Sequence, residues 1–167
     1  VQSRMDALTK ICNRGYGEAQ IEKLLKAKKN GMFLLFDVDK FKHINDTYGH
    51  SIGDEVLIQV ADALKQTFEQ AGVCMRLGGD EFAVYAPEIT EQMQAETMIQ
   101  AFFERIRNIA IPQMEGDAIS VSLGAVLCAP DREHVFEKVY QRADATMYTC
   151  KKVIGNSYDF YTGRNPA

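Results

Sequence analysis

The sequence predicts an α+β fold with a mainly antiparallel central sheet and helices packed on its faces. Short apolar segments alternate with helical patterns, two short strands are joined directly across Gly78 and Gly79, and no linker or composition break divides the chain. Paired glycines between two strands are typical of a hairpin. A purely parallel sheet would need a helix at every crossover. We therefore expect a single domain over residues 1–167.

The elements are expected in the order helix, strand, helix, two strands, helix, strand, helix, strand. Helices are indicated by apolar residues at helical spacing, and strands by short apolar runs bounded by turn residues. In chain order these are a helix from Gly17 to Lys29, a strand over 32–36, a polar, turn-rich stretch over 40–53, a helix from about Val56 that Gly72 ends, hairpin strands over 73–77 and 80–85, a helix over 91–109, a strand over 119–127, a helix over 132–153 and a strand over 158–161.

The composition excludes several classes of protein. The formal net charge of -4 provides no global positive field for DNA. No apolar run approaches the roughly 18 residues of a membrane span, and the first residues lack a signal-peptide pattern. We expect a cytoplasmic domain without membrane contact. The four cysteines have neither zinc-site nor disulfide-framework spacing and are expected to be reduced.

Two acidic clusters fall where strands meet turns. Asp37 and Asp39 end the first strand, and Asp80 and Glu81 follow the glycine pair. If the first strand lies beside the hairpin, Asp37 and Asp80 can share a divalent cation, because Mg²⁺ prefers a few carboxylate oxygens and leaves positions for water and phosphate. The alternative is that these are solvated acids in turns.

The string RLGGDEF at 76–82 and several further motifs resemble the GGDEF family of diguanylate cyclases, which join two GTP molecules into cyclic di-GMP. The other matching segments are DALT at 6–9, NR at 13–14, FDVDKFK at 36–42, NDTYGH at 45–50, GD at 53–54, SVSLGA at 120–125, and AD at 143–144 with Tyr148 and Lys151. The resemblance implies a βαββαβ core like that of class III nucleotide cyclases and polymerase palm domains.

The resemblance also implies where the metal and catalytic chemistry lies. Asp37, the backbone carbonyl of Val38 and Asp80 would bind Mg²⁺ or Mn²⁺, two ions per GTP. Asp37, Asp80 and Glu81 would form the catalytic set, with Glu81 assisting the attacking hydroxyl. Asp39 is expected to organise its loop instead of binding metal.

Substrate recognition is implied at further positions. Asn45 and Asp54 would read guanine, because a carboxylate can accept hydrogen bonds from its ring N–H and its exocyclic amine. The alternatives are a turn amide for Asn45 and an acid at a helix N-terminus for Asp54. The remaining implied residues are Lys42, Lys151 and the backbone N–H groups of Lys40 and Phe41 for the phosphates, and Gly78, Gly79 and Phe82 for the signature turn.

The sequence departs from the family pattern at two places. Gly155 stands where the family usually has Arg or Lys, so one cation for the triphosphate is missing, and Lys152 is a candidate substitute. Glu69 and Gly72 stand where many relatives have an Arg-x-x-Asp product site, so we expect no inhibitory product site.

These features predict a metal-dependent diguanylate cyclase that releases pyrophosphate, with each chain of a transient homodimer holding one GTP. The alternative is a catalytically weak or degenerate domain that binds GTP or a protein as a regulatory module. The resemblance fills the chain, so we expect an upstream sensor or receiver domain in the full-length protein, including the case of a membrane-anchored receptor with this cytoplasmic output domain.

Overall fold

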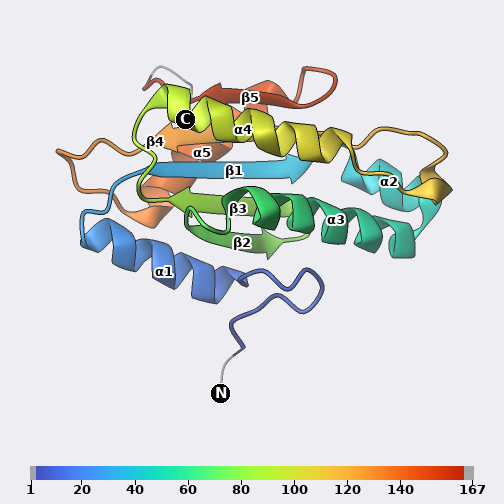
Figure 1. Ribbon diagram of the computed structural model, residues 1–167, viewed down its shortest axis with the longest axis horizontal. Coiled ribbons are helices and arrows are strands. Elements are labelled where there is room, and N and C mark those ends of the chain that lie inside the picture. Colours follow the sequence, from blue (N-terminus) through green and yellow to red (C-terminus); the bar gives the residue numbers. More distant parts are fainter. Residues whose placement is uncertain (1–2, 164–167) are drawn as a thin grey trace.

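The computed structural model describes residues 3–163 and contains a mixed sheet flanked by helices (Figure 1). The elements are α1 (Arg14–Lys26), β1 (Met32–Val38), α2 (Phe41–Tyr48), α3 (His50–Phe68), β2 (Val73–Gly78), β3 (Glu81–Ala86), α4 (Gln92–Arg107), the 3₁₀ helix η1 (Pro112–Met114), β4 (Val121–Leu127), α5 (Phe136–Cys150) and β5 (Ser157–Phe160). None of the helices within residues 3–163 is long and apolar enough to cross a membrane.

The sheet has the strand order β2-β3-β1-β4-β5. The pairs β2–β3, β3–β1 and β1–β4 are antiparallel, and β5 joins β4 in parallel. The chain from β1 to β4 therefore follows the βαββαβ order expected from the sequence. The central strand β1 is an apolar run with almost every residue buried, as expected for a strand covered on both faces.

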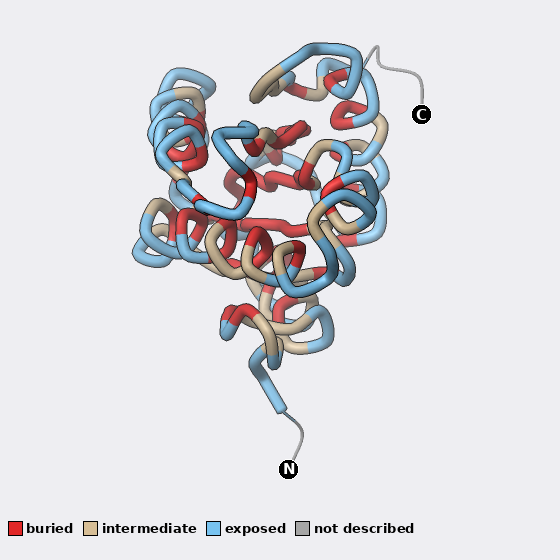
Figure 2. Tube along the Cα trace, turned by 90° about the vertical axis from the view of Figure 1, so that its right-hand side faces the viewer, coloured by how far each residue is buried: buried red, intermediate tan, exposed pale blue. Residues whose placement is uncertain are grey.

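Helices cover both faces of the sheet. In Figure 1, α3 and α4 lie on the viewer's side and α5 lies behind the sheet. Side chains from α3 and α4 pack with alternate strand residues in one apolar cluster, and side chains from α1 and α5 pack with the others in a second cluster. In Figure 2 the buried strand positions run between these helical layers. Alternation along each strand therefore decides which layer a side chain meets.

Several expectations about local structure were wrong. The first helix, expected from Gly17 to Lys29, spans Arg14–Lys26. The polar stretch predicted over 40–53 contains the helix α2 and the first turn of α3. Phe41, Ile44 and Tyr48 of α2 recur at helical spacing and pack in one apolar cluster, but the segment has only eight residues and the others are polar, so its short pattern also fits a turn-rich stretch. The last helix begins at Phe136, not near 132, and ends at Cys150, not near 153. The Phe136 N–H donates to Glu22 Oε1 of α1 at 2.8 Å, a tertiary contact that local spacing does not reveal.

Candidate active site

The two acidic clusters meet at one edge of the sheet. β1 pairs with β3 in a register that places Asp37 opposite Glu81, so the expectation that the first strand lies beside the hairpin is confirmed. The Val38 N–H donates to the Asp80 carbonyl at 3.3 Å, which joins the end of β1 to the hairpin turn. In Figure 1 this edge lies where the β1 arrow ends, close to α2.

Asp37 carries an unpaired oxygen at this edge. Its Oδ2 accepts a hydrogen bond from Lys151 Nζ at 2.5 Å, whereas its Oδ1 is buried without a hydrogen-bond partner among the described residues. Burial raises the pKa of the Asp37 carboxyl, the Lys151 ammonium opposes that rise, and the charges of Asp80 and Asp39 add to it. A buried carboxylate oxygen without a donor is costly unless a cation or a proton compensates it.

The hairpin turn presents the second acidic cluster. Gly78 and Gly79 have φ values of 148° and 51°, in the region that favours glycine. Arg76 donates from Nε and Nη2 to the Gly79 carbonyl, at 3.0 and 2.8 Å, which holds the turn in place. Burial raises the pKa of both the Asp80 and the Glu81 carboxyl. Phe82, the next residue, is fully buried and stacks on Phe36 of β1.

Arg76 also connects the turn to the N-terminal segment. Its Nη1 lies 3.2 Å from both carboxylate oxygens of Asp6, and the two side chains are only 16% and 20% exposed. Asp6 in turn accepts hydrogen bonds from the backbone and the hydroxyl of Thr9. One guanidinium group therefore ties the turn that carries Asp80 to the segment around Asp6.

Asp39 has a different environment from Asp37 and Asp80. Its two oxygens accept hydrogen bonds from Ser120 Oγ and Ser122 Oγ, each at 2.6 Å. The Asp39 N–H donates to the Ser120 carbonyl at 2.9 Å. These contacts anchor the turn after β1 to the start of β4, as expected for a residue that organises the loop. The next residue, Lys40, takes a left-handed conformation with φ of 54° and directly precedes α2.

The two residues expected to read guanine lie on neighbouring helices. Asn45 is on α2, and its Oδ1 approaches Gly53 of α3 so closely that a Cβ at Gly53 would lie 1.8 Å away. Gly53 thereby allows the two helices to come together beside Asp54. Asp54 is exposed and lies beyond the first turn of α3, so the alternative of an acid at the helix N-terminus does not fit.

A cavity of about 630 Å³ opens between α2, the segment before β4 and the segment after α5. Its lining includes Lys40, Lys151, Lys152 and Gly155, so two of the predicted phosphate-binding residues lie together with the position of the missing cation. Lys42, Asn45 and Asp54 are not part of this lining, and Lys42 is exposed on α2. The predicted substrate residues therefore lie around α2 and not in one enclosed pocket.

The arrangement fits a divalent cation whose coordination sphere is completed by water and phosphate oxygens. Within residues 3–163, no group of three or more His, Cys, Asp or Glu side chains is positioned to hold a metal ion. The predicted set contains two carboxylates and one backbone carbonyl, which leaves positions for water and phosphate. The buried Oδ1 of Asp37, which has no hydrogen-bond partner in that part of the chain, fits such a ligand.

The family is decided by a match along most of the chain. Residues 3–157 match the family model described as "Diguanylate cyclase, GGDEF domain". The chain belongs to the GGDEF family. This GGDEF chain is 36% identical over 160 residues to the diguanylate cyclase DosC of Escherichia coli, covering 89% of this chain and 33% of DosC. It is 30% identical over 149 residues to the uncharacterized protein YtrP of Bacillus subtilis, covering 89% of this chain and 25% of YtrP.

Solved GGDEF domains have the same fold. The GGDEF domain of DgcB from Caulobacter crescentus, determined in complex with c-di-GMP, superimposes with a TM-score of 0.84 at 25% identity, covering 96% of this chain and 97% of that domain. The GGDEF domain of YfiN from Pseudomonas aeruginosa gives a TM-score of 0.84 at 27% identity, covering 97% and 96%. The expected palm-like fold is therefore confirmed. The chain spans a quarter to a third of the length of DosC and YtrP.

Sequence reasoning missed two contacts in this site. Lys151 was expected to bind phosphate, but here it pairs directly with Asp37. The Tyr140 hydroxyl, which no motif indicated, donates to Glu81 Oε1 at 2.7 Å. Each contact joins α5 or the residue after it to a strand end far away in the chain, so no local sequence signal could reveal it.

Proposed function

We propose that this chain is a diguanylate cyclase that condenses two GTP molecules into cyclic di-GMP and releases pyrophosphate. The observation that carries the proposal is Asp37, whose buried Oδ1 has no hydrogen-bond partner within residues 3–163, beside Asp80 at the same sheet edge. Membership of the family and the cyclase relatives support the same reaction.

Each residue of the site has a proposed part in this reaction. Asp37, the Val38 carbonyl and Asp80 would hold two Mg²⁺ or Mn²⁺ ions, which when bound activate the 3′-hydroxyl and neutralise the leaving pyrophosphate. Glu81 assists the attacking hydroxyl. Lys151, with the N–H groups of Lys40 and Phe41 and the Lys42 side chain, binds the phosphates.

Guanine selection is proposed at Asn45 and Asp54. A carboxylate that accepts from two guanine donors would be left unpaired by adenine, which disfavours ATP. The α2–α3 contact at Gly53 supports this pair, because it keeps the two helices close beside Asp54.

One chain holds one GTP, so the reaction requires a transient homodimer in which each hydroxyl attacks the partner's α-phosphate. Because the chain covers only part of its relatives, we propose an upstream sensor or receiver domain in the full-length protein and a cytoplasmic location for this domain.

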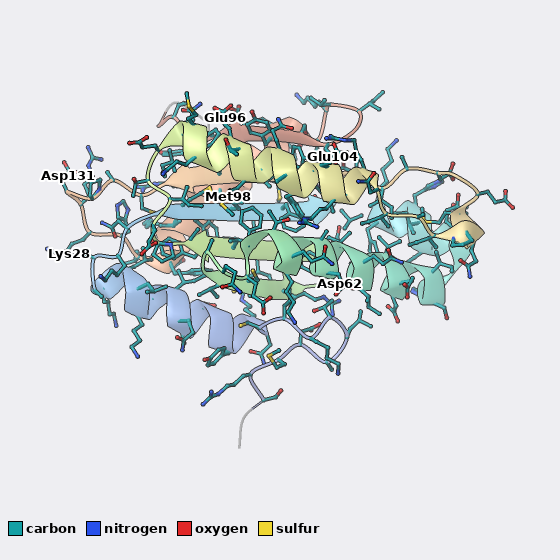
Figure 3. The ribbon with its side chains drawn as sticks, viewed as in Figure 1. Lys28, Asp62, Glu96, Met98, Glu104 and Asp131 are labelled. Carbon is teal, nitrogen blue, oxygen red and sulfur yellow. The ribbon has the colours of Figure 1, made fainter. Side chains whose placement is uncertain are left out.

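The proposal is tested by incubating the chain at high concentration with GTP and Mg²⁺ and separating the products by chromatography. Asp80→Ala should abolish cyclic di-GMP and pyrophosphate. Asp62→Ala is the matched control, because Asp62 is an exposed acid on α3 (Figure 3) and is none of the residues assigned to the reaction. Product from Asp80→Ala at the wild-type rate would refute the assigned site.

A second candidate, a GTP-binding regulatory module without turnover, is favoured by one observation: Gly155 supplies no cation to the cavity beside Lys151. GTP binding without either product in the same assay would support this candidate instead.

A further inference from the structure

Tyr140 of α5 contacts the second acid of the signature. Its hydroxyl donates to Glu81 Oε1 at 2.7 Å, and its ring is half-buried in the apolar cluster between the sheet and α1 and α5. The ring also stacks on Phe136, with centroids 6.1 Å apart and an interplanar angle of 30°. The hydroxyl is therefore held by packing on a rigid helix.

The contact acts on a side chain at the catalytic edge. Glu81 lies opposite Asp37 in the β1–β3 register. Alternation along β3 directs Glu81 to the same face as Ala83 and Tyr85, which pack with α1 and α5. Glu81 thus leaves the sheet toward α5, where an unanchored glutamate would sample several rotamers.

Packing does not explain the hydroxyl. A phenylalanine would fill the same space beside Phe136, whereas the hydroxyl of the half-buried Tyr140 adds a hydrogen bond to Glu81. The acceptor is one oxygen of Glu81, and within residues 3–163 no donor contacts the other oxygen. The hydrogen bond therefore orients the carboxylate and leaves one oxygen available.

We propose that Tyr140 is a positioning residue for the cyclase reaction: it fixes Glu81 Oε1 so that Oε2 stays available to the attacking GTP hydroxyl. This inference rests on the proposed function. Tyr140 does not touch the substrate and acts only through Glu81. Without it Glu81 spends less time in the productive orientation, and a small displacement of a catalytic group lowers turnover more than binding.

The test compares Tyr140→Phe with Tyr161→Phe in the steady-state kinetics of GTP conversion. Tyr161 packs against the same apolar cluster, and its hydroxyl makes no hydrogen bond in the described part of the chain. Tyr140→Phe should lower kcat about tenfold with KM for GTP unchanged. Glu81→Gln should show the same kcat-only pattern with a larger loss, and Tyr161→Phe should match wild type. Thermal unfolding is measured for all variants.

An unchanged kcat in Tyr140→Phe would overturn the inference. So would a rise in KM equal to the fall in kcat, or a loss of stability that accounts for the lost activity, since either indicates a merely structural role. Absence of product from the wild-type chain would refute the proposed function and this inference together, and it is seen before any variant is compared.

Discussion

Replacing Lys151 by Met should separate metal binding from GTP binding. The Lys151 ammonium is 2.5 Å from Asp37 Oδ2, on the carboxylate proposed to hold the cations. A divalent cation arriving at Asp37 must therefore displace this ammonium or share the carboxylate with it. Lys151 also lines the cavity beside α2 and is one of the residues proposed to bind the phosphates. Its removal is expected to strengthen metal binding without nucleotide and to weaken GTP binding.

The magnitude follows from the exposure of the pair. The side chains of Lys151 and Asp37 are 37% and 15% exposed, so the ion pair is partly screened. A partly exposed ion pair of this kind, intermediate between a fully exposed and a fully buried pair, contributes about 1–2 kcal/mol. Relieving that competition should tighten metal binding about 5- to 30-fold. Losing one phosphate cation should raise KM for GTP by the equivalent of about 1–3 kcal/mol.

The assay is calorimetric titration of Mn²⁺ into the chain without nucleotide, followed by KM for GTP at saturating Mg²⁺. Lys152→Met is the matched control, because Lys152 lines the same cavity but makes no ion pair with Asp37 among the described residues. It should leave Mn²⁺ affinity unchanged. Weaker or unchanged Mn²⁺ affinity in Lys151→Met would refute the reasoning.

Three other predictions concern stability, the missing cation and base selection. Burial acts to raise the pKa of Asp6, but hydrogen bonds from Thr9 and Arg76 outweigh it and hold the pKa below its usual 3.8. Asp6→Asn should therefore lower the unfolding temperature at pH 7. The difference in unfolding temperature from wild type should shrink as the pH falls below 3.8. A difference that grows in acid would contradict this. Gly155→Arg should lower KM for GTP but cost about 1 kcal/mol of stability, because Gly155 has φ of 88°. Gly155→Ala should show the loss of stability without the change in KM. Equal KM values in the two variants would count against a missing phosphate contact. Asp54→Ala should reduce the preference for GTP over ATP in competition binding at least about tenfold, and an unchanged preference would exclude Asp54 as a guanine ligand.

Much of the fold could be predicted because its main elements are locally encoded. The apolar run of β1 and the two glycines of the hairpin are visible in the sequence, and both lead to the sheet edge where Asp37 and Asp80 meet. The helix α2 was missed although Phe41, Ile44 and Tyr48 have helical spacing, because eight residues that are mostly polar also fit a turn-rich stretch. Over so short a segment, three apolar residues at helical spacing do not by themselves separate a helix from a loop.

The acidic residues of the site could be predicted from the sequence, but the hydrogen bonds that orient their side chains could not. The loop role of Asp39 was expected, yet its partners Ser120 and Ser122 lie 81 and 83 residues further along the chain. The hydrogen bonds of Glu81 and Asp37 to α5 and Lys151 likewise depend on how that helix packs on the sheet. Long-range hydrogen bonds follow from tertiary packing, which one sequence does not specify locally.

Gly155 shows how the structure changes the meaning of a sequence difference. In the sequence, Gly155 means that a positively charged side chain usual in the family is missing, and Gly155→Arg would restore it. The structure adds a backbone with φ of 88° that faces open space, since a Cβ at this position would meet no described atom within 4 Å beyond its chain neighbours. An arginine there would have room for its side chain but would strain the backbone, so gain in binding and loss in stability must be measured separately.

Each chain is proposed to supply half of an active site that joins two GTP molecules. The most direct measurement is the initial rate of pyrophosphate release from GTP and Mg²⁺ over a range of chain concentrations, with cyclic di-GMP quantified at each point. We expect the release of two pyrophosphates for each cyclic di-GMP and a rate per chain that rises with chain concentration until all chains are dimeric. GTP that remains unconverted at every concentration would contradict this proposal.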